Sequence, residues 1–253
     1  MKAVDRYSQR AISYARYRWD YAPAAVEAAV TECGLTEHSI IADIGSGTGM
    51  LTRHFVDRVR TVFAVEPNSD MRGIAAQTLH GCKAWQSIDG FSDATTLPGG
   101  SVDMITVGRA LHWFPPDSTR TEFGRILRPD GWLAVFSAPC TDQALVGSLK
   151  AIRTEDNGWN VAADKHQLSR VPLSFYFGHD EFQKLTFAGL VKESWEDFLG
   201  RISSTSPCPR SDHPLRSKFE LALREVFERH APDGVLVVTF ATEVVFGRFH
   251  NSR

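Results

Sequence analysis

A glycine-rich segment directly after an apolar run constrains the fold of this chain more than any other feature. The apolar run spans residues 39–42, the sequence DIGSGTG follows at residues 43–49, and a stretch of helical character comes next. Glycine permits a sharp turn and a close approach of the backbone to a ligand, and a helix start offers unpaired N–H groups. The pattern therefore predicts a strand, a glycine turn and a helix that together form a loop for a nucleotide-type cofactor.

The spacing of the glycines and two nearby acids distinguish among cofactors. A dinucleotide fingerprint is spaced G-x-G-x-x-G, whereas here single residues separate the glycines and Asp43 stands two residues before the first. We therefore expect the Asp43 carboxylate to face an amino acid moiety rather than a pyrophosphate. Glu66 ends the apolar run 61–65, where the next parallel strand should finish, and its carboxylate can accept both ribose hydroxyls.

The order of these and later motifs resembles the class I S-adenosylmethionine-dependent methyltransferases, particularly the type 11 small-molecule branch that includes trans-aconitate methyltransferase-like enzymes. The resemblance covers most of the chain and rests on DIGSGTG at 43–49, VEPNSDM at 65–71, SDATTLPGGSVDMI at 92–105, RALHWF at 109–114 and LRPDGWLAVF at 127–136. It implies an α/β fold with a Rossmann-like, doubly wound, seven-stranded sheet, mostly parallel with an antiparallel last strand, plus a helical cover insertion. S-adenosylmethionine is then expected across the carboxyl ends of the first two strands.

The resemblance also implies which residues contact the cofactor. Adenine is expected near Ser92 and Asp93. Asp93 is shorter than the glutamate more common at this place in the family, so contact through the backbone or a water molecule is the alternative. Tyr14 and Arg18 match a Y-x-x-x-R-P-x-Y element, although Trp19 replaces its proline. Arg18 is expected to pair with the methionyl carboxylate, and the alternative is a solvated, arginine-rich helix face. The expected cofactor-binding residues are Asp43, Gly45, Ser46, Gly47, Gly49, Glu66, Pro67, Asn68, Met71, Ser92, Asp93, Arg109, Tyr14 and Arg18.

The acceptor site is expected beside the loop that follows the fourth strand. His112 lies in this loop and, with an ordinary pKa of about 6.5, suits proton acceptance near neutrality. The alternative is that His112 and Trp113 simply hold the loop over the cofactor. Tyr7 completes the expected substrate-binding residues. Because methyl transfer needs in-line attack on a sulfonium carbon, orientation and exclusion of water can supply most of the catalysis, and the lack of an obvious dyad does not argue against it.

Composition favours one soluble enzyme domain with a small-molecule acceptor. The chain has 253 residues, of which 43% are hydrophobic and 23% charged, and its net charge of −2 argues against a bulk electrostatic grip on nucleic acid. Its four cysteines and nine histidines lack metal-ligand spacing, so we expect reduced thiols and no metal. No apolar stretch approaches the roughly 20 residues of a membrane span. We expect a cytoplasmic protein, a monomer or homodimer, with neither a nucleic acid nor a membrane partner.

Hydrophobic periodicity and turn signals predict the order of elements within a single methyltransferase domain over residues 1–253. Its expected parts are an N-terminal lid and packing helix at 1–34, a cofactor-binding core at 35–139, a substrate-cover insertion at 140–212, and a C-terminal helix and strand at 213–253. Strands are expected at 39–44, 61–66, 82–86, 102–107, 132–137, 182–187 and 235–249. Helices are expected at 23–33, 49–58, 69–79, 117–127, 195–202 and 215–230.

Three other functions fit parts of the pattern. An NAD(P)-dependent oxidoreductase shares the sheet but should show the wider glycine spacing. A module that binds S-adenosylmethionine without turnover would retain the same loop. The dipeptide Pro139-Cys140 resembles the nucleophilic cysteine of cytosine-5 methyltransferases, but neither an N-P-P-Y element nor an extended basic stripe accompanies it, which disfavours a nucleobase acceptor.

Overall fold

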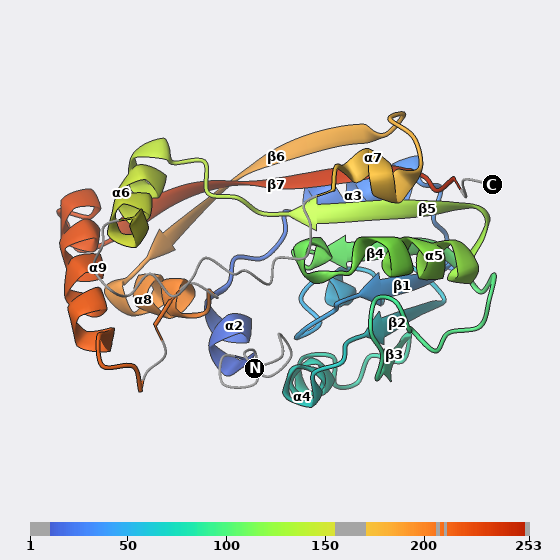
Figure 1. Ribbon diagram of the computed structural model, residues 1–253, viewed down its shortest axis with the longest axis horizontal. Helices are drawn as coiled ribbons and strands as arrows, with labels where there is room; N and C mark the ends of the chain where they lie inside the picture. Colours follow the sequence, from blue (N-terminus) through green and yellow to red (C-terminus); the bar gives the residue numbers. More distant parts are fainter. Residues whose placement is uncertain (1–10, 155–170, 206–207, 210–211, 251–253) are drawn as a thin grey trace.

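A seven-stranded sheet organises the chain in the computed structural model, which describes residues 11–154, 171–205, 208–209 and 212–250. The strand order is β3-β2-β1-β4-β5-β7-β6, and β7 alone runs antiparallel to its neighbours (Figure 1). The predicted doubly wound sheet with an antiparallel last strand is confirmed. The strands are β1 (Ile40–Ile44), β2 (Thr61–Val65), β3 (Trp85–Ile88), β4 (Val102–Gly108), β5 (Leu127–Ser137), β6 (Gln183–Glu193) and β7 (Leu236–Arg248).

Helices cover both faces of the parallel part of the sheet, as a buried parallel sheet requires. On one face, Val26 and Ala29 of α3 pack with Phe55, and on the other, Phe123 of α5 and Phe177 of α7 pack together. The helices described are α2 (Ala11–Tyr17), α3 (Pro23–Glu32), α4 (Ser69–Thr78), α5 (Pro116–Ile126), α6 (Gln143–Thr154), α7 (Leu173–Phe177), α8 (Trp195–Ser203) and α9 (Arg216–His230). None of these is long and apolar enough to cross a bilayer.

The helix predicted at 49–58 is wrong. This segment holds only one turn of 3₁₀ helix, η1 (Thr52–His54), between other turns. Several of its backbone hydrogen bonds close over three residues, as from Phe55 N–H to the Thr52 carbonyl. The buried side chains of Leu51 and Phe55, and the hydroxyl of Thr52 bonded to Asp43, hold the backbone in this path. Tertiary contacts here outweigh a weak local helix preference.

Three further boundaries differ from expectation. The edge strand predicted at 82–86 lies at 85–88, and the strand predicted at 182–187 extends to Glu193. The strand predicted at 132–137 begins earlier, at Leu127, and contains a bulge, since Leu127 pairs with Val102 while Trp132 pairs with Met104. These shifts follow from strand pairing, which local sequence does not specify.

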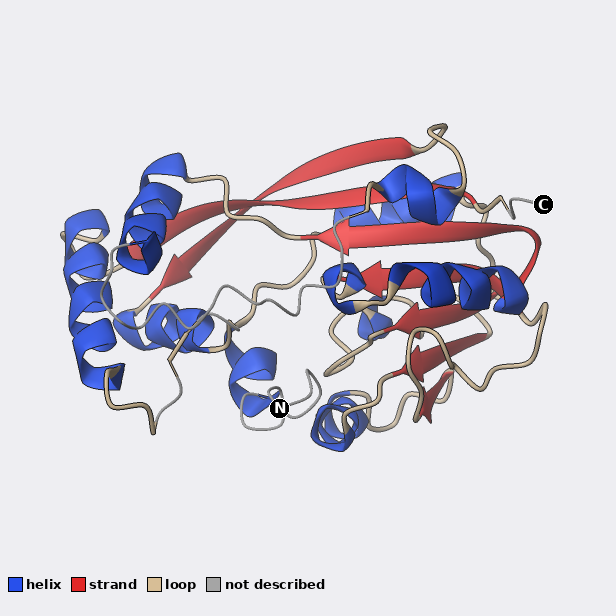
Figure 2. Cartoon of the chain, viewed as in Figure 1, coloured by secondary structure: helices blue, strands red, loops and turns tan. Residues whose placement is uncertain are grey.

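The antiparallel strands continue past the parallel sheet and carry a second group of helices, which we call the C-terminal lobe (α6, α8, α9 and the β6–β7 ribbon). The last pair between β5 and β7 joins Ser137 to Glu243, whereas β6 and β7 stay paired as far as Glu193 and Leu236. The helices α6, α8 and α9 pack on this extension around a separate apolar cluster. Figure 2 shows the lobe beside the parallel sheet, and Figure 1 shows α2 next to α8.

A buried carboxylate fixes the loop that enters the site from β3. Glu122 of α5 accepts hydrogen bonds from the Thr95 N–H and hydroxyl, at 2.9 and 2.5 Å, and pairs with Arg125 at 2.6 Å. Burial acts to raise the pKa of Glu122, but the hydrogen bonds from Arg125 and Thr95 outweigh it and lower the pKa to about 2. The loop that carries Ser92 is therefore held against α5. Asp103 of β4 accepts the Ile40 N–H at 2.7 Å and so ties β4 to the start of β1.

Candidate functional site

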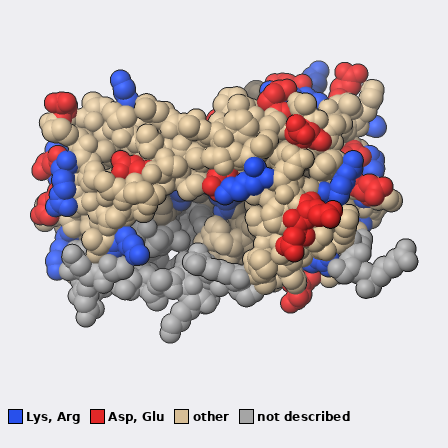
Figure 3. Space-filling model, turned by 90° about the horizontal axis from the view of Figure 1, so that it is seen from above, with Lys and Arg blue, Asp and Glu red and all other residues tan. Residues whose placement is uncertain are grey.

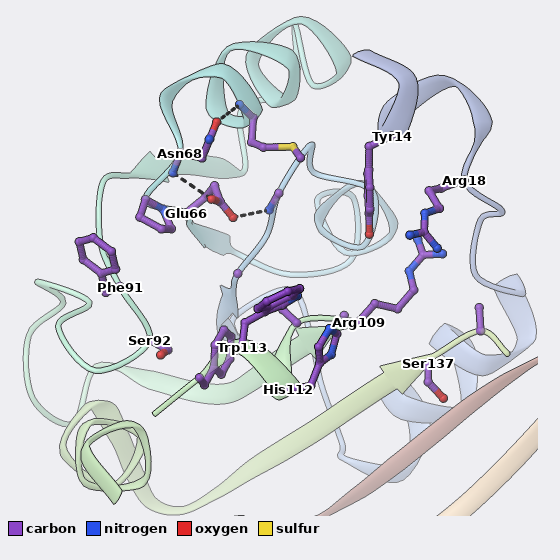
Figure 4. A pocket seen from close by; sticks show the side chains of 18 of the residues that line it. Tyr14, Arg18, Glu66, Asn68, Phe91, Ser92, Arg109, His112, Trp113 and Ser137 are labelled. Atoms are coloured by element: carbon purple, nitrogen blue, oxygen red, sulfur yellow. Dashed lines mark hydrogen bonds between the residues drawn. The ribbon is translucent and has the colours of Figure 1, made fainter. Parts of the chain in front are cut away.

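A cavity of about 820 Å³ opens at the carboxyl ends of β1, β2 and β4, beneath the N-terminal segment that carries α2 (Figure 4). This is the place where ligands bind in open α/β sheets. Thirteen of the residues singled out from the sequence line it. They are Tyr14, Arg18, Gly45, Gly47, Glu66, Pro67, Asn68, Met71, Ser92, Asp93, Arg109, His112 and Trp113.

The three glycines of the loop share a left-handed backbone conformation but lie in different surroundings. Gly45, Gly47 and Gly49 have φ values of 68°, 57° and 77°, in the left-handed region that favours glycine. A Cβ atom on Gly45 would lie 2.7 Å from the Ala110 Cβ, whereas one on Gly47 would meet nothing within 4 Å. Gly49 packs against α4, where a Cβ atom would lie 3.1 Å from Leu79, and it does not line the cavity. Only the first two glycines therefore form the cavity wall.

Glu66 closes β2 with its carboxylate in the cavity wall. One oxygen accepts the Gly47 N–H at 3.0 Å and the other accepts the Asn68 N–H at 2.9 Å (Figure 4). The Asn68 side chain in turn caps α4 by accepting the Met71 N–H at 2.9 Å. Burial raises the pKa of Glu66, although these amides favour its charged form. The motif VEPNSDM thus joins the carboxylate, the glycine loop and a helix start.

Asp43 lies at the end of β1 and is fully buried. Its oxygens accept the hydroxyls of Thr52 at 2.6 Å and Thr106 at 3.1 Å. Burial raises the pKa of Asp43 to about 6 despite these two bonds. Asp43 and Ser46 line a smaller cavity of about 30 Å³ beside the main one. A polar space of this size holds about one water molecule or one small polar group.

Arg109 lines both cavities and is held in an unusual conformation. Its φ is 55°, uncommon for a residue with a side chain. The guanidinium lies over the Tyr21 ring at 4.7 Å, Nη1 donates to the Trp19 carbonyl at 3.0 Å, and Nη2 lies 2.6 Å from the Met50 sulfur. Its Nε is buried and has no acceptor among the described residues. A permanently charged group with an unused donor therefore stands between the two cavities.

The loop after β3 forms one end of the main cavity. Ser92 shares a hydrogen bond with Thr119 at 2.9 Å, and Asp93 accepts the Ser118 hydroxyl at 3.1 Å. Phe91 precedes them with 52% of its surface exposed. We did not identify Phe91 from the sequence, although an aromatic residue directly before a predicted binding pair is a usable signal.

The remaining wall of the cavity draws on segments that are distant in the sequence. His112 and Trp113 belong to η2 (Leu111–Trp113), with His112 exposed and its ring 5.0 Å from that of Trp113. Ser137, Thr205 and Glu243 also line this region, and the sequence analysis missed them. Ser137 donates to Glu243 at 3.3 Å across 106 residues of chain. No local pattern brings these residues together.

Two expectations concern parts of the chain that are only partly described. Tyr7 and residues 155–170 of the expected cover lie outside the described residues. Within the described ranges, no group of three or more His, Cys, Asp or Glu side chains is arranged to hold a metal ion.

Comparison with other sequences shows similarity to methyltransferases. A family model described as a methyltransferase domain matches residues 42–135. An uncharacterized methyltransferase of Schizosaccharomyces pombe is 30% identical over 225 residues, which cover 85% of this chain and 84% of that protein. An uncharacterized methyltransferase of Mycobacterium tuberculosis is 32% identical over 123 residues, which cover 49% of this chain and 48% of that protein.

Solved structures share the fold at lower sequence identity. A candidate type II methyltransferase from Anaeromyxobacter dehalogenans has a TM-score of 0.64 at 18% identity, covering 93% of this chain and 100% of its own. The YcgJ protein of Bacillus subtilis has a TM-score of 0.56 at 16% identity, covering 90% and 99%. These likenesses extend across nearly the whole length of each structure and concern the fold.

Proposed function

The chain belongs to the class I S-adenosylmethionine-dependent methyltransferases, and from this premise we propose that it methylates an oxygen, nitrogen or carbon atom of a small-molecule metabolite. The observation that carries the proposal is the cavity of about 820 Å³. Sites for small ligands span roughly 300 to 1,000 Å³, so this one has room for a cofactor and a small acceptor together. The trans-aconitate methyltransferase-like branch remains our proposal for the subfamily.

We assign the ends of the cofactor to the walls of the cavity. The Glu66 carboxylate suits the ribose hydroxyls, and the loop of Phe91, Ser92 and Asp93 suits adenine. Asp43 and Arg109 carry opposite charges and line the same small cavity, which supports placing the methionyl ammonium at Asp43 and its carboxylate at Arg109. Arg18 lines the main cavity and is a second candidate for that carboxylate.

The cofactor supplies a methyl group activated by a sulfonium. The walls of the cavity orient the acceptor for in-line attack and exclude water, which can contribute effective molarities of roughly 10⁵ M or more. Where the acceptor loses a proton that water does not readily accept, His112 is positioned to receive it at the acceptor end. We propose that segment 140–212 covers this end and that the enzyme acts as a monomer or homodimer.

Cys140 gives further support to a small-molecule acceptor over a nucleobase. Burial raises the pKa of its thiol, and the Cys140 backbone pairs with Phe240 in an isolated bridge. A nucleophilic cysteine requires the opposite shift, because the thiolate is the reactive form. The face seen in Figure 3 also carries acidic and basic side chains intermixed rather than a continuous basic surface.

Ligand-induced thermal stabilisation tests the proposed function. S-adenosylhomocysteine at about 100 times its dissociation constant should add about 2.7 kcal/mol and raise Tm by roughly 5 to 10 °C. NAD and NADP should leave Tm unchanged. Glu66→Ala should lose most of the rise, whereas the matched control Glu220→Ala, on the outer helix α9, should retain it. Stabilisation by the nicotinamide cofactors alone would overturn the assignment.

Substitution of His112 separates its two candidate roles. Because His112 is exposed at the cavity mouth, we expect His112→Ala to lower turnover about 10²-fold and to leave the Kd of S-adenosylhomocysteine nearly unchanged. The measurement is kcat on an acceptor found by screening, together with calorimetric binding. His112→Gln, which retains a hydrogen-bonding side chain, should lower turnover as much as His112→Ala does if His112 is the base. Weakened cofactor binding in His112→Ala would instead show that His112 holds the loop.

A further inference from the structure

The indole of Trp19 joins the N-terminal segment to the C-terminal lobe. Its ring stacks on Phe240 of β7, with centroids 5.0 Å apart and planes at 26°. The guanidinium of Arg201, from α8, lies 4.3 Å from the centre of the same ring. The indole Nε1–H donates to Glu193 Oε1 at 2.7 Å. Trp19 is therefore fixed by two contacts with its ring and one hydrogen bond, all to residues far along the chain.

The partners of Trp19 are themselves a buried ion pair. Glu193 is 2% exposed and Arg201 7% exposed, and Arg201 donates twice to the carboxylate, from Nε at 2.6 Å and from Nη2 at 2.8 Å. A buried pair of this kind contributes little net stability, because desolvation offsets much of the attraction. Its bidentate geometry is specific, however, and fixes the orientation of whatever it contacts.

The packing of α2 on α8 also fixes the backbone that precedes Trp19. Gly200 of α8 lies directly against the Tyr17 ring, where a Cβ atom would come within 2.4 Å of the ring. The Tyr17 hydroxyl donates to Glu196 at 3.0 Å. The end of α2, which leads to Trp19, is therefore held on α8 of the lobe.

The backbone of Trp19 contacts Arg109, which lines the proposed cofactor site. Its carbonyl accepts the Arg109 Nη1–H at 3.0 Å. In Figure 4, the Arg109 side chain extends from the loop after β4 toward the N-terminal segment. Arginine has a long side chain with many rotamers, and holding it in one orientation before binding removes an entropic cost from the binding step.

We propose that Trp19, held by the Glu193–Arg201 pair, is a positioning residue that orients the Arg109 guanidinium toward the methionyl carboxylate. The Glu193–Arg201 pair of the C-terminal lobe then influences cofactor affinity although neither residue lines the two cavities. This inference rests on the proposed function, and in particular on the carboxylate lying at Arg109. It predicts that substitutions at Trp19, or at Glu193 and Arg201 together, weaken the binding only of those ligands that carry the carboxylate.

The test compares S-adenosylhomocysteine with its decarboxylated analogue, which lacks only that carboxylate. Trp19→Phe retains an aromatic ring and loses the Nε1–H donor. We expect this variant to raise the Kd of S-adenosylhomocysteine about tenfold and the Kd of the analogue by less than about twofold, both measured by calorimetry. The paired variant Glu193→Met with Arg201→Met should behave alike, since it removes both charges together, leaves no unpaired buried ion and leaves the Trp19 Nε1–H without its acceptor at position 193. Arg224→Gln, on α9 of the same lobe, is the matched control and should bind both ligands normally.

A double-variant cycle shows whether the effect passes through Arg109. In an Arg109→Ala background, Trp19→Phe should cause no further loss. An equal loss for the two ligands, no loss for S-adenosylhomocysteine, or additive losses in the cycle would each overturn the inference. If the unaltered protein binds S-adenosylhomocysteine normally in those cases, the proposed function stands. Failure of the unaltered protein to bind it would refute both.

Discussion

With the methionyl carboxylate at Arg109, as proposed, Arg109→Ala should weaken S-adenosylhomocysteine binding by about 2 to 5 kcal/mol, or roughly 30-fold to several thousand-fold, because it removes one partner of a buried, hydrogen-bonded charge pair. The guanidinium lines both cavities and retains an unused Nε donor there. The decarboxylated analogue should lose far less affinity. The measurement is the calorimetric Kd of both ligands, with Tm recorded to confirm folding.

Two further variants help to interpret the loss of affinity expected for Arg109→Ala. Arg109→Lys keeps the charge but not the planar fork, so we expect an intermediate affinity. Arg18→Ala tests the second arginine that lines the cavity, and a larger selective loss there would move the carboxylate from Arg109 to Arg18. Equal weakening of both ligands by Arg109→Ala would show that Arg109 supports the cavity wall and does not bind the carboxylate.

Cofactor affinity should fall about tenfold per pH unit below pH 6, because in the proposed site Asp43 must lose its proton to receive the methionyl ammonium. Burial raises the pKa of the free Asp43 carboxyl to about 6, and a bound ammonium would favour its charged form. Binding then releases a proton below pH 6 and becomes pH-independent above it. Calorimetry in two buffers of different ionisation enthalpy measures that proton directly.

The stability of the ligand-free protein should show the opposite trend with pH. The pKa of Asp43 rises from an ordinary value of 3.8 to about 6 on folding, so the folded state prefers the protonated form. Its contribution to stability is greatest below about pH 4 and is lost as the pH rises through 6, a change of at most about 3 kcal/mol. Thermal unfolding of the free and bound protein across pH 4 to 7 would separate the two trends.

The variant Asp43→Asn tests whether Asp43 is the group whose proton causes the pH dependence of cofactor binding. It should flatten the pH dependence of binding below pH 6 and weaken binding at pH 7.5. Glu66 needs its own control because burial also raises its pKa and it interacts with Asp43. Glu66→Gln should weaken binding while the slope persists. An unchanged slope in Asp43→Asn would assign the proton to another group.

Much of the parallel sheet and half of the site could be predicted because their signals are local. The strands β1, β2 and β4 lie within one or two residues of expectation, since short apolar runs bounded by turn residues are typical of buried strands. The glycine loop and Glu66 meet at one edge because the carboxyl ends of neighbouring parallel strands must meet there. The roles assigned to these residues in binding remain predictions.

Local patterns failed where distant contacts decide the conformation. Residues 49–58 have an acceptable helical pattern, yet the burial of Leu51 and Phe55 and the bond from Thr52 to Asp43 give them another path. The edge strand β3 is displaced by three residues from the predicted start because its position depends on pairing with β2. In both cases the free energy of packing exceeds the small differences in local propensity.

The sequence by itself determined the family, the order of strands along the chain and the carboxylates beside the glycine loop, because each depends on residues close together in the chain. Only the tertiary structure decided which residues share the cavity and what orients them. Trp19 meets Glu193 across 174 residues, and Ser137 meets Glu243 across 106. Contacts of such range form only when the whole sheet and its lobe are assembled, because they depend on long-range pairing rather than on local preference.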